Sequence, residues 1–159
     1  MANNTQYAVN VTPTETPTVD YGTASNVLAT DIGKSIGGGS TIAIAGSMED
    51  NVGFENGAAV YLEVTNGGSD VLNADTTERS LIVIKNTGYE FSTTAALGSA
   101  ITKKFTVTMG SKLIAELGAG DIMVLPNAGG GANDLKCSEI TVIAEDGTSI
   151  ACEFTAIPL

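Results

Sequence analysis

Hydrophobic and polar residues alternate along several short stretches of the chain. In AVYLEVTN, Val60, Leu62 and Val64 fall on one side of an extended backbone, and Tyr61, Glu63 and Thr65 fall on the other. KFTVTMG at 104–110 repeats this pattern. Because successive side chains of a strand point to opposite faces, each stretch predicts a strand with one face on a core.

Two other stretches are continuously apolar and predict buried strands. SLIVIKN at 80–86 is typical of a central strand covered on both faces, and DIMVLP at 121–126 of a short buried strand that ends at Pro126. Turn-forming segments such as NGGSD, GAGD and NAGGGAND separate these stretches. Short strands divided by such turns predict an all-β fold, an antiparallel β-sandwich of the jelly-roll or immunoglobulin-like kind.

The segment GSKLIAELGAG at 110–120 fits two structures. It predicts either a helix over 111–118, with Ser111 as N-cap and Gly118 as the C-terminal stop, or an extended piece that leads into the next strand. We favour the extended form, because the apolar run is too short for a stable helix.

The segment SEITVIAEDGTSIACEF at 138–154 predicts a hairpin. A turn at 145–147, with glycine in the left-handed position, pairs Ala144 with Thr148. This register places Val142 opposite Ile150 and Ile140 opposite Cys152, so one face of the hairpin is apolar.

The same register separates the two cysteines. Cys137 and Cys152 fall on opposite faces of the predicted hairpin, so we expect no disulfide between them. Cys152 is expected to be a small core residue, and Cys137, on the same face as Glu139, the more reactive thiol.

The first forty residues differ from the rest of the chain. Residues 1–20 are rich in Thr, Asn and Pro, and Pro13 and Pro17 favour extended backbone, which predicts an extended N-terminal arm. Residues 21–40 are expected to be a glycine-rich connection, and residues 41–159 the β-sandwich domain, with a first strand at 41–45.

That connection contains Gly33-Lys34-Ser35, which has the look of a phosphate-binding loop. However, Leu28 stands where such a loop has its first glycine, and the three glycines of IGGGST cannot open a helix. We therefore expect no nucleotide site here.

Composition and charge exclude several classes of function. Only 16% of residues are charged, the net charge is −11, and the chain has neither histidine nor tryptophan. A surface with this charge repels phosphate backbones, so we expect no nucleic-acid partner. Without histidine the commonest general base and zinc ligand are missing, and we expect neither an enzyme nor any catalytic, cofactor or metal site.

The acidic residues themselves form no known cation-binding pattern. Glu49-Asp50, Asp70, Asp75 and Glu78 lack the spacing of a calcium loop, so we interpret them as a solvated face, with a weak cation site as the alternative. The start of the chain does not resemble a secretory signal, and no apolar stretch approaches about 20 residues. We therefore expect no membrane partner and synthesis in the cytoplasm.

Taken in order, the segments VLNADTTERS, LIVIKNTG, KFTVTMG, GAGDIMVLP and ITVIAEDGTSIACEFTAIPL outline a known type of protein. This order of strands and turns, roughly residues 70–159, resembles the small β-sandwich head decoration (cement) proteins of tailed bacteriophages. The resemblance rests on the order of elements, and it carries no residue-level motif.

The resemblance implies a structural virion protein that binds the outer surface of the capsid and stabilises the shell by bridging capsomers. It implies the major capsid protein and further copies of this chain as partners, the latter as a homotrimer, and an arm that reaches across neighbouring subunits. The alternatives are a phage tail or fibre-base protein, and a bacterial surface-layer or adhesion β-module.

Overall fold

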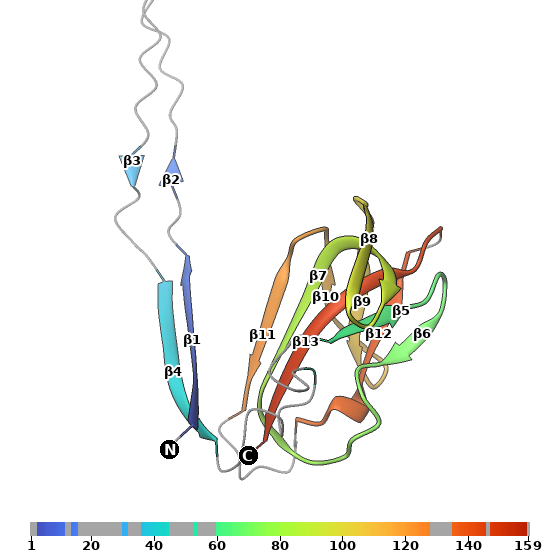
Figure 1. The fold of residues 1–159 in the computed structure, drawn as a ribbon. Helices are drawn as coiled ribbons and strands as arrows, with labels where there is room; N and C mark the ends of the chain where they lie inside the picture. Colours follow the sequence, from blue (N-terminus) through green and yellow to red (C-terminus); the bar gives the residue numbers. More distant parts are fainter. Residues whose placement is uncertain are drawn as a thin grey trace, which may run out of the picture. The chain divides into compact units, whose positions relative to one another are not determined.

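The computed structural model describes residues 3–11, 14–15, 30–31, 36–44, 53, 60–127, 135–145 and 147–158. The chain divides into two compact units, Asn4–Ala43 on the one hand and Met1–Asn3 with Ile44–Leu159 on the other. The predicted all-β sandwich is confirmed for the second unit, in which two antiparallel sheets pack together (Figure 1).

The sandwich consists of nine strands and one short helix in the described residues. In chain order they are β5 (Tyr61–Val64), β6 (Ser69–Val71), β7 (Arg79–Thr93), β8 (Ala96–Ala100), β9 (Phe105–Met109), β10 (Lys112–Leu117), β11 (Ile122–Pro126), the 3-10 helix η3 (Cys137–Glu139), β12 (Ile140–Ala144) and β13 (Ile150–Pro158). The four-stranded sheet has the order β10-β9-β12-β6. The five-stranded sheet has the order β11-β7-β13-β5, and β8 pairs with the C-terminal half of β7.

The core lies between the inner faces of the two sheets. The alternation predicted for β5 and β9 is confirmed, because Val64, Phe105 and Val107 are buried in the core cluster. The extended form of 112–117 is also confirmed, since this segment is β10. Alternating side chains therefore pack the inner faces as the sequence predicts.

A buried amide connects the core to the turns around it. Asn86, which is fully buried in β7, donates from Nδ2 to the carbonyl oxygens of Lys103 at 3.0 Å and Leu117 at 2.9 Å. Its Oδ1 accepts from the N–H of Gly88 at 3.0 Å. Because every polar atom of this side chain has a partner, the amide fixes the positions of three backbone segments at little desolvation cost.

The predicted C-terminal hairpin is wrong. β12 pairs with β9 and β6 in the four-stranded sheet, whereas β13 pairs with β7 and β5 in the other sheet. The loop between them runs from one sheet to the other. Its backbone is hydrogen-bonded to the side chain of Asn66 and, through the N–H of Glu145, to the carbonyl oxygen of Lys104. The predicted apolar face is nevertheless buried, because the two strands face each other across the core.

Two predictions of buried strands also need correction. β11 is an edge strand that pairs only with β7, and Ile122 is 60% exposed, so DIMVLP is not a buried run. β7 is central, as predicted, but its outer face is covered only in part: Leu81 is buried, while Val83 and Lys85 are half-buried. An apolar run shows that side chains avoid water, not which strands lie beside it.

The N-terminal unit contains two pairs of strands. β1 (Asn3–Val11) pairs with β4 (Ile36–Ile44), and β2 (Thr14–Glu15) pairs antiparallel with β3 (Thr30–Asp31). The strand predicted at 41–45 thus begins at Ile36 and includes the three glycines of the predicted connection. Strands from the predicted arm, residues 1–20, therefore pair with strands that begin in the predicted connection, residues 21–40. The role of the arm, and the division of the chain after residues 20 and 40, stay predictions.

Candidate functional surface

The residues that the sequence singled out do not converge on one site. Gly33-Lys34-Ser35 and Glu49-Asp50 lie outside the described residues. Asp70 accepts hydrogen bonds from the backbone N–H and the hydroxyl of Thr65, both at 2.8 Å, and so closes the turn between β5 and β6. Among the described residues, no three His, Cys, Asp or Glu side chains are placed to hold a metal ion.

Asp75 belongs to a polar cluster around the buried Arg79 that the sequence did not reveal. Its carboxylate pairs with the guanidinium of Arg79, the only arginine of the chain, whose side chain is 3% exposed. Asp75 Oδ1 also accepts from the N–H of Thr77 at 2.7 Å. Hydrogen bonds from Thr77, together with the charge of Arg79, lower the pKa of Asp75. Among the described residues the Nε of Arg79 is buried without a hydrogen-bond partner, and the carboxylate of Asp75 provides an opposite charge for this buried guanidinium.

Cys137, next to this cluster, is fully buried, so its predicted position on a strand face with Glu139 is wrong, while its faster reaction than that of Cys152 stays a prediction. The residue lies in η3 and not in a strand, so the alternation of a strand does not apply to it. Burial raises the pKa of Cys137. Cys152 is buried in β13, as predicted, and burial raises its pKa to about 12. Both thiols are free, and both are protonated at neutral pH.

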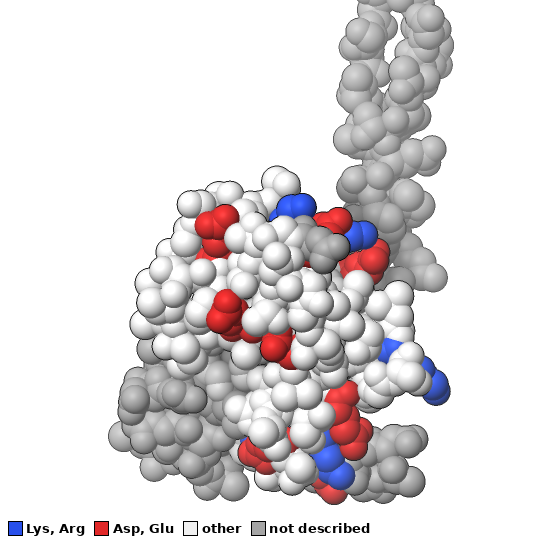
Figure 2. Space-filling view, turned by 90° about the vertical axis from the view of Figure 1, so that its right-hand side faces the viewer, with Lys and Arg blue, Asp and Glu red and all other residues white. Residues whose placement is uncertain are grey.

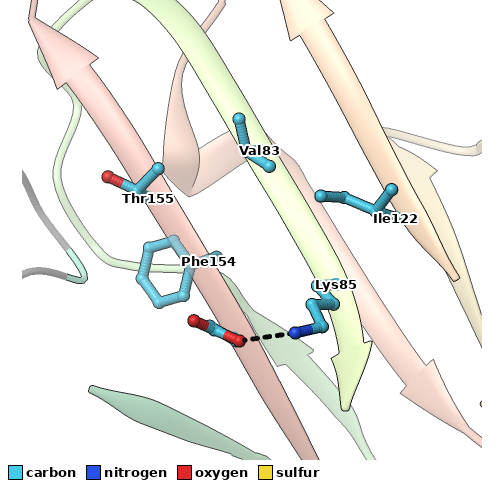
Figure 3. Close-up of a pocket in the computed structure, with 6 residues that line it drawn as sticks. Val83, Lys85, Ile122, Phe154 and Thr155 are labelled. Carbon is cyan, nitrogen blue, oxygen red and sulfur yellow. Dashed lines mark hydrogen bonds and ion pairs between the residues drawn. The ribbon is translucent and has the colours of Figure 1, made fainter. Parts of the chain in front are cut away.

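The outer face of the five-stranded sheet carries a shallow hollow of about 210 Å³. Its lining is shown in Figure 3 and comes from β7, β11 and β13: Val83, Lys85, Ile122, Glu153, Phe154 and Thr155. The ammonium group of Lys85 lies 3.2 Å from the carboxylate of Glu153 across neighbouring strands. The two charged groups of this hollow thus compensate each other, which leaves a small open depression with no free charge in its lining.

The outer face of the four-stranded sheet has a different composition. The strand register aligns Val71, Thr141, Thr108 and Leu113 in one row across all four strands. A second row aligns Ser69, Ile143 and Thr106 and ends at Glu116 on β10. We call the seven uncharged residues of these two rows the threonine face: Ser69, Val71, Thr106, Thr108, Leu113, Thr141 and Ile143.

The threonine face is more apolar than its residue names suggest. The hydroxyl groups of Thr106 and Thr108 donate to the carbonyl oxygens of Ile143 and Thr141, at 3.5 and 3.4 Å. Each hydroxyl is therefore directed to the backbone of the neighbouring strand and not only to solvent. At the two ends of the first row Val71 is 46% and Leu113 62% exposed.

Charge lies around the threonine face and begins at Glu116, which continues the second row on β10. Glu116, at the edge, is 3.3 Å from Lys104, which compensates its charge in part. Figure 2 shows one side of the sandwich, on which carboxylates are spread over the surface with uncharged areas between them. In a chain of net charge −11, seven uncharged residues side by side on paired strands mark a surface suited to contact with another molecule.

The sequence contains a signal for the threonine face that its alternation alone does not reveal. The outward positions in the middle of KFTVTMG and of SEITVIAED are Thr or Ile, and the charged residues Lys104, Glu139 and Glu145 stand at the ends of these segments. A solvated face usually carries charge in its middle as well. The sequence does not show which strands pair with one another, and this pairing is what brings the uncharged residues side by side.

Comparison with known proteins does not assign the chain to a group. No protein family, curated protein or solved structure matches it significantly. Within the described residues, no helix has the length and apolar character needed to cross a membrane.

Proposed function

We propose that this chain is a structural virion protein that decorates the outer capsid surface of a tailed bacteriophage and cements the shell by bridging capsomers. The observation that carries the proposal is the threonine face, an uncharged sheet surface with exposed Val71 and Leu113 on a strongly acidic protein. The resemblance of residues 70–159 to head decoration proteins supports the same function.

In this proposal the threonine face lies against the major capsid protein. Backbone spacings give a sheet of four strands and about five residues an area of roughly 300 Å². A stable interface buries about 800 Å² on each partner, so one such face holds weakly. Several faces joined in one oligomer bind together much more strongly, which is the physical reason for the proposed homotrimer.

Location follows from the same proposal. The protein is made in the host cytoplasm and ends on the capsid exterior. A shell under internal pressure separates first where capsomers meet, and a protein that contacts two capsomers adds interface area at that point. Neither a cofactor nor a reaction is part of this function.

The decisive experiment compares two matched variants for binding to capsids of the phage that encodes the chain. Leu113→Asp places a carboxylate on the threonine face, and Ile122→Asp places one on an edge strand of the other sheet. The two wild-type side chains are 62% and 60% exposed, so both variants are expected to fold. Cosedimentation with capsids that lack the protein should show about tenfold weaker binding for Leu113→Asp, because a carboxylate loses water on entering an apolar interface. Ile122→Asp should bind like the wild type.

Electron microscopy of the virion then locates the wild-type chain. Density on the outer capsid surface is the expected result, and density confined to the tail or fibre base would favour that alternative. If the wild-type protein binds no capsid, the proposed function is wrong. If Ile122→Asp alone weakens binding, the function stands and the threonine face is not the contact surface.

A further inference from the structure

Asn66 connects two loops that both pass from one sheet to the other. It lies in the turn between β5 and β6, and its side-chain Nδ2 donates to the carbonyl oxygen of Gly147 at 2.9 Å. The N–H of Gly147 donates in return to Asn66 Oδ1 at 2.6 Å. Gly147 belongs to the loop between β12 and β13, 81 residues further along the chain. The Asn66 amide thus donates one hydrogen bond to the Gly147 backbone and accepts another from it, as a residue of a neighbouring strand would, and so connects the two loops.

The residue after Asn66 is a glycine, which gives this position a specific reactivity. Gly67 and Asn66 are both exposed, and Gly67 has a φ of 61° in a turn that Gly68 closes by donating to the Thr65 carbonyl oxygen. An asparagine followed by glycine deamidates readily, because glycine has no side chain to block attack by its own backbone nitrogen. The order Asn66-Gly67 at an exposed turn therefore combines reactive chemistry with access to water.

We propose that Asn66 is a deamidation site whose rate is controlled by its two hydrogen bonds to Gly147, and whose modification releases the loop between β12 and β13. The Gly67 nitrogen loses its proton and bonds to Asn66 Cγ, the bond from Cγ to the amide nitrogen breaks, and ammonia leaves. Water then opens the resulting succinimide to aspartate or isoaspartate. The reaction needs no other reactant, and it is independent of the proposed capsid role.

The structure explains why the two hydrogen bonds slow the deamidation of Asn66 and why deamidation releases the loop. While both hydrogen bonds hold, the amide is directed to Gly147 and cannot turn its Cγ onto the Gly67 nitrogen. The product carboxylate has no N–H to donate, and it would face the Gly147 carbonyl oxygen, so the mutual bonding cannot reform. Isoaspartate also adds a backbone carbon to the turn. The modification is irreversible and would act as a slow timer on this end of the sandwich.

The rate is tested on the unchanged chain by peptide mapping with mass spectrometry at pH 8 and 37 °C. We expect Asn66 to deamidate at least tenfold more slowly in native protein than in urea-unfolded protein, in which Asn56, also followed by glycine, serves as the reference for an unprotected site. Equal rates for Asn66 in native and unfolded protein would overturn the control by Gly147.

The consequence is tested by hydrogen exchange at the Gly147 N–H. Asn66→Asp should speed this exchange at least tenfold, because the new carboxylate repels the Gly147 carbonyl oxygen and its oxygens move away from the Gly147 N–H. Asn73→Asp is the matched control, since the described contact of Asn73 is made by its Oδ1, which accepts from the N–H of Asp75 at 2.8 Å, and aspartate keeps that acceptor without facing a carbonyl oxygen there. If hydrogen exchange at the Gly147 N–H is unchanged in Asn66→Asp, or rises equally in Asn73→Asp, the proposed release of the loop is wrong. If Asn66→Asp does not fold, exchange is measured on wild-type protein deamidated in its native state.

Discussion

The two outer faces of the sandwich differ in both burial and charge. On the five-stranded sheet, Leu81 and Ile157 are paired on the outer face and are 0% and 1% exposed, while Lys85 and Glu153 form an ion pair further along. On the four-stranded sheet, the seven residues of the threonine face are uncharged, and Leu113 remains 62% exposed. One sheet thus buries side chains on both of its faces, and the other keeps one face open.

This difference indicates that one sheet contributes more to stability and that the outer face of the other is available for binding. A sheet that buries both faces at one end contributes more to the free energy of unfolding, because more apolar area leaves water. An open, uncharged face contributes little to folding and is available to a partner. The following predictions test this division, in order of expected effect.

The largest effect is expected from the same substitution on the two faces. Leu81→Ala should lower the free energy of unfolding by about 3 kcal/mol, because it leaves a cavity where the side chain was fully buried. Leu113→Ala should cost less than about 1 kcal/mol, since most of that side chain already contacts water. Urea unfolding followed by circular dichroism measures both, and equal losses would remove the distinction between the faces.

The next effect concerns the buried arginine at the start of β7. Asp75→Asn should lower the free energy of unfolding at pH 7 by about 2 kcal/mol, because it leaves Arg79 without an opposite charge, with the loss limited by the partial exposure of Asp75. Since folding lowers the pKa of Asp75, its contribution is present above the ordinary value of 3.8 and is lost as the pH falls through the folded value.

The measurement for this pair is unfolding as a function of pH. The wild type should lose stability in acid relative to the variant, so that the two curves approach each other as the pH falls below 3.8 and through the lower folded pKa. A constant difference between wild type and Asp75→Asn at all pH values would show that the carboxylate charge does not stabilise Arg79.

A smaller contrast is expected between the two thiols. Cys152 lies in β13, a strand inside the five-stranded sheet with β7 and β5 on its two sides, and Cys137 lies in the single turn of η3 that leads into the four-stranded sheet. Both should react slowly with an alkylating reagent in the native state, since burial raises both pKa values. Cys137 should react first, because a single turn opens more easily than a central strand.

Mass spectrometry of the alkylated protein gives the order, with urea-unfolded protein as the control in which both thiols react at similar rates. Faster labelling of Cys152 would show that the five-stranded sheet opens first. The non-reduced protein should contain no bond between the two sulfur atoms.

The smallest effect is expected from the ion pair on the five-stranded sheet. Lys85→Ala should change the free energy of unfolding by less than about 1 kcal/mol, because the lysine side chain is 43% exposed and its charge is screened by solvent. Glu153→Ala is the matched change on the other partner. A loss of several kcal/mol for either variant would mean that this hollow, and not the buried end at Leu81, stabilises the sheet.

Alternation of side chains predicted much of this fold and left out the pairing of strands. It identified β5, β9 and the inward residues of β12 and β13, because the two-residue period depends only on local backbone geometry. It could not show that β12 and β13 lie in different sheets, since the same inward faces fit a hairpin and a crossing equally well. The position of β11 at an edge is likewise a property of its neighbours.

The polar features were harder to predict because each depends on distant partners. Arg79 stands in a polar segment, TTERS, and nothing local indicates that its side chain is buried. Cys137 was assigned to a strand because the segment ITVIA was extended backward into η3. The bond between Asn66 and Gly147 joins loops 81 residues apart, and no periodicity contains that information.

The position of β13 has a consequence for how the protein is made. This strand lies between β7 and β5, yet it follows both of them in the sequence, and 68 residues separate Lys85 from its partner Glu153. During translation, at about 5–20 residues per second, β7 and β5 therefore leave the ribosome seconds before the strand that joins them. Over that interval the nascent chain carries two unpaired strand edges, which a chaperone or a neighbouring chain can bind. The rate at which the ribosome reaches residue 158 thus sets how long the protein is open to misassembly.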